Sequence, residues 1–336
     1  MKRPPPYLVR RLIIDPLFVL GSVLALAAMP LWILVAAFAS RFVPGRWRPL
    51  RVAWFLFLYV AIEAIMLVAL FLLWVASGFG WKLRSPRFVA LHYRLAGWWL
   101  RRVMGSARRT FNLVVGPPNE SELSPGRPIL VFCRHAGPGD SFLLVDALLN
   151  RAQRHPRIIL KDLLQLDPCV DVALNRLPNS FVPSTGRAGQ AVVDSITELS
   201  AGLGERGALV LFPEGGNFTP ARRRRAIQKL DEIGRPGLAD RAREMQHVLP
   251  PKPSGALAAI EAAPHADVVF VGHVGLEELT TMRDLWRGIP MDSNVESRIW
   301  PVKAEDVPAP EDQELWLYDH WAQIDDWIDE KLGDPS

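Results

Sequence analysis

Two long apolar stretches near the start of the chain limit what it can fold into more than any other feature. The first runs from about Leu12 to Ser40 and the second from about Ala53 to Phe79. Each is longer than the roughly 20 apolar residues that a membrane-spanning helix needs, and the first is too long for the core of a signal peptide, which has roughly 7–15 residues. The sequence therefore predicts an N-terminal hydrophobic two-helix membrane hairpin.

Charge is distributed unevenly along the 336 residues. Residues 1–110 contain 16 Lys and Arg against 2 acidic residues, whereas the remainder contains 23 against 33. A region that is both basic and apolar favours membrane lipids with anionic headgroups as partners, and no nucleic acid. We therefore predict a membrane location, in the cell inner membrane, with the rest of the chain on the cytoplasmic side.

Positive residues lie at both ends of the hairpin and at its tip, around Arg46 and Arg48, so the positive-inside rule leaves two arrangements open. The hairpin either spans the bilayer or dips into one leaflet, and both arrangements put its two ends on the same side. Glu63 lies in the middle of the second stretch, where a carboxylate is costly. A functional role and a structural one, protonated or paired within the hairpin, are both open for Glu63.

From residue 101 onward, short apolar runs alternate with amphipathic stretches. Strands are predicted at 128–134, 157–161, 179–184, 207–213 and 266–274, with an edge strand at 297–302. Helices are predicted at 141–152, 189–203 and 253–263, with an acidic amphipathic helix at 316–332. Strands that alternate with helices indicate an α/β fold with a mostly parallel sheet flanked by helices. The predicted organisation is a hairpin with a basic juxtamembrane segment over 1–100 and an α/β domain over 101–336.

Two charged motifs directly follow predicted strands. R-H-A-G-P-G-D (134–140) comes after PILVFC, and F-P-E-G-G-N (212–217) comes after GALVL. In an open parallel sheet, ligands bind outside the carboxyl ends of the strands. If both strands run parallel, His135, Asp140 and Glu214 lie at one edge of the sheet.

The spacing of His135 and Asp140 has a physical meaning. On a regular helix, residues five apart point about 140° away from each other and would not meet, but the Gly-Pro-Gly between these two favours a tight turn. Such a turn can bring the carboxylate to one imidazole nitrogen, where it fixes the tautomer and leaves the other nitrogen to take a proton from an alcohol. The activated hydroxyl then attacks an acyl carbonyl directly, without a Ser or Cys nucleophile.

In this order and about 80 residues apart, R-H-A-G-P-G-D and F-P-E-G-G resemble the first and third signature blocks of the glycerol-phosphate and lysophospholipid acyltransferase family, which includes 1-acylglycerol-3-phosphate acyltransferases. The resemblance covers roughly residues 100–330 and implies an acyltransferase of phospholipid biosynthesis or remodelling. It implies His135 as the general base and Asp140 as its partner, with Glu214 and Gly215 binding the glycerol part of the acceptor. The acceptor implied is a lysophospholipid or 1-acylglycerol-3-phosphate, and acyl-CoA or acyl-carrier protein is the co-substrate that donates the acyl group.

The second family block departs from its usual pattern, in which a basic residue shortly after a Phe-Val-like pair contacts the acceptor phosphate. Here Phe181-Val182 is followed by Arg187. Arg187 and Lys161, which lies at the end of a predicted strand, are the candidates for binding phosphate. The residues after Glu-Gly and the stretch 247–255 resemble the branch that handles lysophospholipids or lysocardiolipin. The sequence has no cluster of His, Cys and Asp with metal-ligand spacing, so no metal or other cofactor is predicted.

Two alternatives to acyl transfer remain open. A lipid acyl hydrolase would keep the fold and use water in place of the acceptor hydroxyl, although the sequence lacks the G-x-S-x-G elbow of serine hydrolases. A non-catalytic membrane-binding relative would keep the fold without the reaction, and the intact pair of His135 and Asp140 argues against it.

Overall fold

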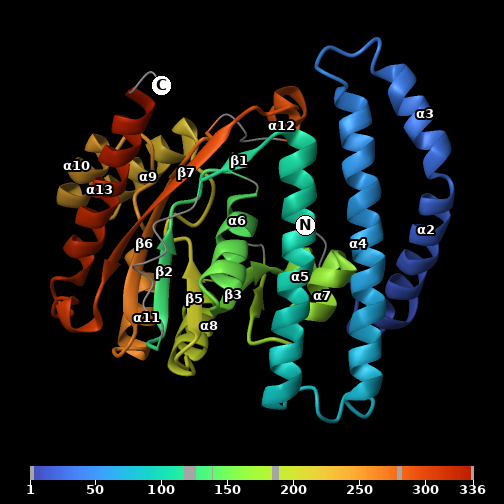
Figure 1. Cartoon of the computed structure of the whole chain (residues 1–336). Helices are drawn as coiled ribbons and strands as arrows, with labels where there is room; N and C mark the ends of the chain where they lie inside the picture. Colours follow the sequence, from blue (N-terminus) through green and yellow to red (C-terminus); the bar gives the residue numbers. More distant parts are fainter. Residues whose placement is uncertain (1–3, 117–125, 138, 184–188, 278–281, 334–336) are drawn as a thin grey trace. The chain divides into compact units, whose positions relative to one another are not determined.

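The computed structural model describes residues 4–116, 126–137, 139–183, 189–277 and 282–333 (Figure 1). Its contacts divide the chain into two compact units. The helical unit comprises Met1–Leu113, Ile158–Gly189 and Ile289–Asp292, and the sheet unit comprises Val114–Arg157, Gln190–Gly288 and Ser293–Ser336. The helical unit therefore takes up a segment from the middle of the sequence, far from the N-terminal hairpin.

The first apolar stretch is a broken helix rather than a straight one. It comprises α1 (Tyr7–Val9), a π-helical turn (Arg10–Ile14), α2 (Asp15–Ala27) and α3 (Met29–Ala39), with a 61° bend before α3. Pro30 lies in the first turn of α3. It has no N–H to donate, and its ring would clash with the carbonyl four residues earlier in a continuous helix, so the helix breaks before it. By length and composition, α4 (Arg48–Ala76) is long and apolar enough to span a membrane by itself. The two bent segments, Tyr7–Ala27 and Met29–Ala39, would do so only if they are taken together as one span.

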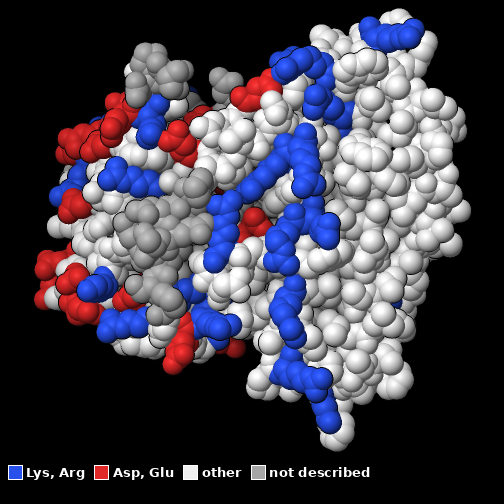
Figure 2. All heavy atoms as spheres, viewed as in Figure 1, with Lys and Arg blue, Asp and Glu red and all other residues white. Residues whose placement is uncertain are grey.

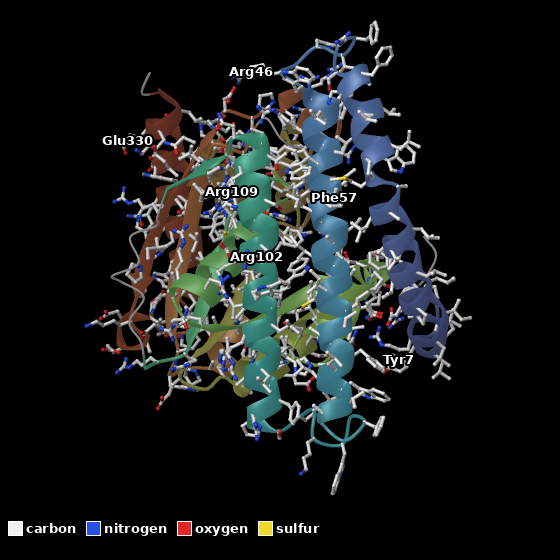
Figure 3. The ribbon with its side chains drawn as sticks, turned by 45° about the vertical axis from the view of Figure 1, so that its right-hand side comes forward. Tyr7, Arg46, Phe57, Arg102, Arg109 and Glu330 are labelled. Carbon is white, nitrogen blue, oxygen red and sulfur yellow. The ribbon has the colours of Figure 1, made fainter. Side chains whose placement is uncertain are left out.

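Helix α4 is accompanied along its length by α5 (Pro86–Phe111), which runs in the opposite direction (Figures 1 and 3). Near one end, the Arg51 side chain donates to the carbonyl of Thr110 over 2.6 Å, and near the middle Trp99 Nε1 donates to Glu63 Oε1 over 2.8 Å. Glu63 is fully buried. The carboxylate in the middle of the second apolar stretch is thus paired inside the helical unit.

A short helix from the middle of the sequence, α7 (Pro168–Leu174), packs on α4 within the helical unit. Its N-cap, Asp167, accepts from the backbone N–H of Val170 and also from Tyr59 Oη over 2.9 Å. Asp171 is buried and forms an ion pair with Arg10 at 2.7 Å. Burying a charge without a partner is costly. These contacts join α7 to the helices that form both arms of the predicted hairpin.

The strands form a seven-stranded sheet in the order β1-β7-β6-β2-β5-β3-β4. Their bounds are β1 Val114–Val115, β2 Ile129–Cys133, β3 His155–Lys161, β4 Ser180–Val182, β5 Gly207–Leu211, β6 Asp267–Val274 and β7 Asn294–Val302. The pairs β1–β7, β2–β5, β2–β6 and β3–β4 are parallel, and β6–β7 is antiparallel. β3 begins in the sheet unit and continues into the helical unit. The prediction of a mostly parallel sheet is confirmed.

One strand prediction was wrong in its position. The strand predicted at 297–302 begins earlier, as β7 at Asn294. The strand β7 is not an edge strand, because β1 pairs with its first two residues, Asn294 and Val295, on the side away from β6. β1 has two residues, which is too short for any hydrophobic pattern to stand out in the sequence.

The remaining α-helices of the described residues lie in the sheet unit, apart from Gly189 at the start of α8. They are α6 (Asp140–Asp146, continued by a π-helical turn Ala147–Arg151), α8 (Gly189–Ala201), α9 (Pro220–Glu232), α10 (Pro236–Glu244), α11 (Pro253–Ala262), α12 (Met282–Gly288) and α13 (Gln313–Gly333). The acidic C-terminal helix α13 packs on β6, with Trp321 fully buried and Trp316 5.2 Å from the ring of Phe270. Gly272 permits this approach, because a Cβ there would lie 3.1 Å from Ile324.

Candidate active site

His135 and Asp140 meet at the carboxyl end of β2. Strand β2 is fully buried and ends at Cys133, and the chain then turns back on itself before α6 starts at Asp140. Gly139 makes the turn in the left-handed region, at φ 118°, which favours glycine because it has no Cβ. His135 Nδ1 lies 2.9 Å from Asp140 Oδ2, so the geometry suits a hydrogen bond that fixes the imidazole.

The Asp140 carboxylate is held by backbone donors of the same turn. Oδ2 accepts from the N–H groups of Ala136 and Gly137, over 2.9 and 3.2 Å, and Oδ1 accepts from Ser141 N and Oγ, over 2.6 and 3.2 Å. Asp140 is 3% exposed. Since every donor lies within one turn of the residue, the carboxylate has little freedom to move away from His135.

Two histidines flank this carboxylate. Burial alone would raise the pKa of Asp140, but the hydrogen bond from His135 and the electrostatic interactions with His135 and His273 outweigh it and hold the pKa below its ordinary value. Asp140 is therefore ionised at neutral pH and can stabilise an imidazolium at His135.

The second motif contacts His135 at three points. The ring of Phe212 lies 4.6 Å from the imidazole, Glu214 Oε1 accepts from the His135 N–H over 3.2 Å, and the Phe218 N–H donates to the His135 carbonyl over 2.8 Å. Within the described residues, His135 Nε2 has no hydrogen-bond partner, and the side chain is 22% exposed. The free nitrogen is therefore available to a substrate hydroxyl.

Glu214 faces the protein backbone. It is 3% exposed, and its second oxygen accepts from the Leu249 N–H over 3.3 Å. Burial raises the pKa of Glu214 to about 8, although the charge of Arg134 and the two N–H donors act in the opposite direction. The contacts describe a residue that orients His135 through its backbone, and binding of the acceptor by Glu214 stays a prediction.

The raised pKa of Glu214 predicts a particular pH dependence of stability. The folded state keeps this proton up to about pH 8, whereas the unfolded state releases it near pH 4.5, so the stabilisation is complete below pH 4.5 and is lost as the pH rises towards 8. Between pH 5 and 8, the wild type should lose on the order of 2 kcal/mol more unfolding free energy than Glu214→Gln. Tryptophan fluorescence during denaturant unfolding in detergent measures this.

Glu277→Gln is a suitable control for that experiment. The charge of Arg134 lowers the pKa of Glu277 against the opposing effect of burial, so its titration lies below the measured pH range. Equal slopes for the wild type and Glu214→Gln would contradict the raised pKa.

Basic side chains lie over the glycines that follow Glu214. Gly215 has φ 70°, and a Cβ there would lie 2.5 Å from Lys252 Nζ, while a Cβ on Gly216 would lie 3.1 Å from Arg222 Nη1. Partial burial, followed by the charges of Lys229 and Arg222, lowers the pKa of Lys252. The absence of side chains at the two glycines therefore lets two cations approach the backbone beside Glu214.

The structure does not test the two phosphate candidates from the sequence. Lys161 is exposed at the end of β3, in the helical unit. Arg187 lies outside the described residues. Of the four consecutive arginines 222–225, Arg223 donates to backbone carbonyls of α10 and the residue after it, and so has a structural role.

Sequence reasoning missed several residues of the site. Phe212 was part of a recognised motif and Phe218 directly follows it, but their contacts with His135 depend on how the loop after β5 returns to β2. His273 was visible as a histidine near a strand end, and its place beside Asp140 depends on the register of β6 against β2. Lys252 was visible in the stretch 247–255, yet its approach to Gly215 follows from the backbone bond between Lys252 N–H and the Pro213 carbonyl.

Comparisons with known proteins found similarity to one family and to one solved structure. Residues 118–273 match the family model described as Acyltransferase. No curated protein sequence matches the chain. Among solved structures, the crystal structure of the 1-acyl-sn-glycerophosphate (LPA) acyltransferase PlsC from Thermotoga maritima is similar, with 17% sequence identity, a TM-score of 0.46, and coverage of 82% of this chain and 99% of that chain.

The fold and the site define an α/β protein with a His–Asp pair at the carboxyl edge of a mostly parallel sheet. Residues 118–273, which match the Acyltransferase family model, include both motifs. The match therefore supports the family predicted from these motifs over this part of the chain.

Proposed function

We propose that the protein transfers a fatty acyl group from acyl-CoA or acyl-carrier protein to a hydroxyl of a lysophospholipid or 1-acylglycerol-3-phosphate. The observation that carries the proposal is the buried, ionised Asp140 at 2.9 Å from His135 Nδ1, with Nε2 left without a partner among the described residues. This arrangement provides a base of fixed tautomer, as direct attack by a lipid hydroxyl requires.

In the proposed reaction, His135 Nε2 takes the proton of the acceptor hydroxyl while the oxygen bonds to the thioester carbonyl carbon. Asp140 stabilises the imidazolium that forms. The tetrahedral intermediate collapses, the carbon–sulfur bond breaks, and His135 returns the proton to the leaving thiolate. The products are an ester and a free thiol, and the base is restored.

We propose that Lys252 and Arg222 bind the phosphate of the acceptor. Their cationic groups approach Gly215 and Gly216, directly after Glu214. Arg222 also lies in the first turn of α9, whose N-cap Thr219 accepts from the Arg222 N–H over 3.2 Å. The positive end of the helix dipole also favours an anion at the start of α9.

Replacement of Lys252 by alanine tests this subsite. We expect KM for an anionic lysolipid to rise about tenfold with kcat changed less than twofold, because a charge-assisted contact is lost without any change at His135. Initial rates over a range of acceptor concentrations in mixed micelles measure both constants. Arg225→Ala, from the same basic run, should leave KM within twofold, and an equal rise in both variants would contradict a specific role for Lys252.

Membrane attachment through the helical unit is part of the proposal. Large apolar side chains of α2, α3 and the following loop are exposed, among them Leu17, Leu20, Leu24, Leu31, Leu34, Phe38 and Phe42. Exposed apolar surface of this extent favours a lipid environment. A location in the cell inner membrane, with the acyltransferase domain on the cytoplasmic side, would bring the domain to its lipid acceptor.

A row of arginines along α5 favours one of the two hairpin arrangements. Arg87, Arg94, Arg101, Arg102 and Arg109 are exposed at spacings near seven residues, and Figure 2 shows basic side chains along this helix beside an uncharged surface. Arg102 and Arg109 are labelled in Figure 3. Arginine in the middle of a bilayer is costly, and α4 is paired with α5 at both the end and the middle of its length. We therefore propose that the hairpin lies in one leaflet, with α5 at the headgroups.

An assay of acyl transfer separates this function from its alternatives. The purified full-length protein is incubated with radiolabelled acyl-CoA or acyl-carrier protein and a panel of lysolipids that includes 1-acylglycerol-3-phosphate. Label in a diacyl lipid supports transfer and names the acceptor. Release of fatty acid with every acceptor left unacylated would instead indicate a hydrolase, and neither product would indicate a non-catalytic relative.

A further inference from the structure

A second imidazole lies beside the carboxylate of the candidate active site. His273 is near the end of β6, which pairs in parallel with β2 so that Cys133 is opposite Val271. His273 is two residues beyond Val271, and His135 is two residues beyond Cys133, just after the end of β2. The two histidines are therefore level with each other. His273 Nε2 lies 3.7 Å from Asp140 Oδ2, the oxygen that receives the hydrogen bond of His135 Nδ1.

The imidazole of His273 is buried without a hydrogen bond. The residue is 6% exposed, and neither ring nitrogen has a partner among the described residues. Its backbone, in contrast, is fixed, because the His273 carbonyl accepts from Arg134, which also pairs with Glu277 Oε1 at 2.8 Å. A buried polar group without a partner is costly, and the nearest charged acceptor that the structure gives this ring is Asp140.

The charged groups around the two rings define the electrostatics of this arrangement. Arg134 and His135 approach from the end of β2, Glu214 from the loop after β5, and Glu277 from the segment after β6. On the neighbouring strand β7, the residue opposite His273 is the neutral Ser297. Arg134 and Glu277 neutralise each other, and burial raises the pKa of Glu214 to about 8, so that it is mostly protonated at neutral pH. Among the described groups around the rings, Asp140 is therefore the negative one that interacts with both imidazoles.

We propose that His273 is a positioning residue for Asp140, and that it donates a hydrogen bond from Nε2 to Oδ2 during catalysis. The proposal rests on the proposed function of His135 and Asp140 and adds to it. Closing the 3.7 Å distance to a hydrogen bond needs a movement of less than 1 Å. A second donor on Oδ2 fixes the carboxylate and weakens its attraction for the His135 proton, which keeps His135 neutral and able to act as a base.

The sign of the effect on the pH profile follows from this role. A carboxylate favours the charged form of a neighbouring imidazole, and a second donor on that carboxylate reduces the effect. Without the His273 donor, His135 should become protonated at higher pH. The acid limb of the kcat/KM profile should then move to higher pH, by about half a unit or more, while kcat falls about tenfold.

His273→Leu and His273→Gln form a matched pair of variants. Leucine removes the donor, whereas the glutamine amide places an N–H near the position of Nε2. We expect the leucine variant to show the shifted acid limb with an unchanged KM for the acceptor, and glutamine to restore the limb to its wild-type position. His320→Leu is the control, because His320 stacks on Phe270 of the same strand at 4.2 Å, on the face covered by α13.

A double variant separates the positioning role from a loss of structure, and a replacement variant covers the case in which His273→Leu does not fold. If His273 acts through Asp140 and His135, the double variant His135→Ala/His273→Leu should lose no more transfer than His135→Ala alone. Additive losses, or a leucine variant with an unshifted acid limb, would overturn the proposal. If the leucine variant does not fold, His273→Asn replaces it, because the asparagine amide lies near Nδ1 and should show the shift that glutamine does not.

The inference is also testable without turnover. The protonation midpoint of His135, followed by NMR of histidine-labelled protein, should rise in His273→Leu and stay at the wild-type position in His273→Gln. A wild-type protein that transfers no acyl group would refute the proposed function, whereas an unchanged midpoint in His273→Leu would refute the role of His273.

Discussion

Replacement of His135 by alanine is expected to lower kcat for acyl transfer at least about a thousandfold. Among the described residues, the His135 imidazole lies beside the ionised Asp140 and has a nitrogen that can take a proton from a hydroxyl. A positioned general base typically increases the reaction rate by a factor of about 10²–10⁴. KM for the acceptor should change little, because Lys252 and Arg222 are untouched. Initial rates with a radiolabelled acyl donor measure the loss.

The fold should survive this change, since the backbone bonds of residue 135 to Glu214 and Phe218 do not involve the imidazole. His247→Ala provides a matched control. The His247 side chain pairs with Asp329 on α13 at 3.1 Å, away from the His135 contacts, and its loss should change kcat less than threefold. Transfer by His135→Ala within tenfold of the wild type would refute the proposed mechanism.

Asp140→Asn is expected to reduce both activity and stability. The carboxylate accepts from five donors, and an amide has one oxygen with which to accept them. Either the His135 side or the Ser141 side of the turn must therefore face an NH₂ group. We expect kcat to fall about 10²–10³-fold through loss of the fixed tautomer, and the free energy of unfolding to fall about 1–3 kcal/mol through buried N–H groups without partners.

Both effects are measurable on one preparation, by transfer rates and by chemical unfolding in detergent. Ser141→Ala removes a single 3.2 Å hydrogen bond to the same carboxylate and leaves the backbone donor in place. Its kcat should stay within threefold of the wild type. An Asp140→Asn variant as active as Ser141→Ala would show that the carboxylate does not support the base.

Local patterns were sufficient to predict the parallel core of the fold. Strands β2 and β5 are buried at every position, so they appear in the sequence as continuous apolar runs, and the glycines between His135 and Asp140 indicated the turn that brings the pair together. The break between α2 and α3 was not predicted, because the apolar composition continues without interruption through Pro30.

The contacts that support the pair could not be predicted from local patterns, because they join distant segments. Glu214 meets His135 across 79 residues of sequence, and Arg134 meets Glu277 across 143. The place of His273 beside Asp140 depends on strand register, which a one-residue shift would reverse by turning the side chain to the opposite face. The short strand β1, which makes β7 an interior strand, carries too little pattern to be recognised.

The position of α7 has a consequence for how this molecule can be divided. Residues 158–189 belong to the helical unit, where Asp171 pairs with Arg10, Tyr59 donates to Asp167, and Cys169 donates to the Glu63 carbonyl over 3.3 Å. Deleting the first hundred residues would leave the buried Asp171 without Arg10, its ion-pair partner. The segment 158–189 would also lose the helices on which it packs. The apolar N-terminal helices are thus part of the folded helical unit, and a variant meant to be less apolar should change their exposed side chains while keeping their length.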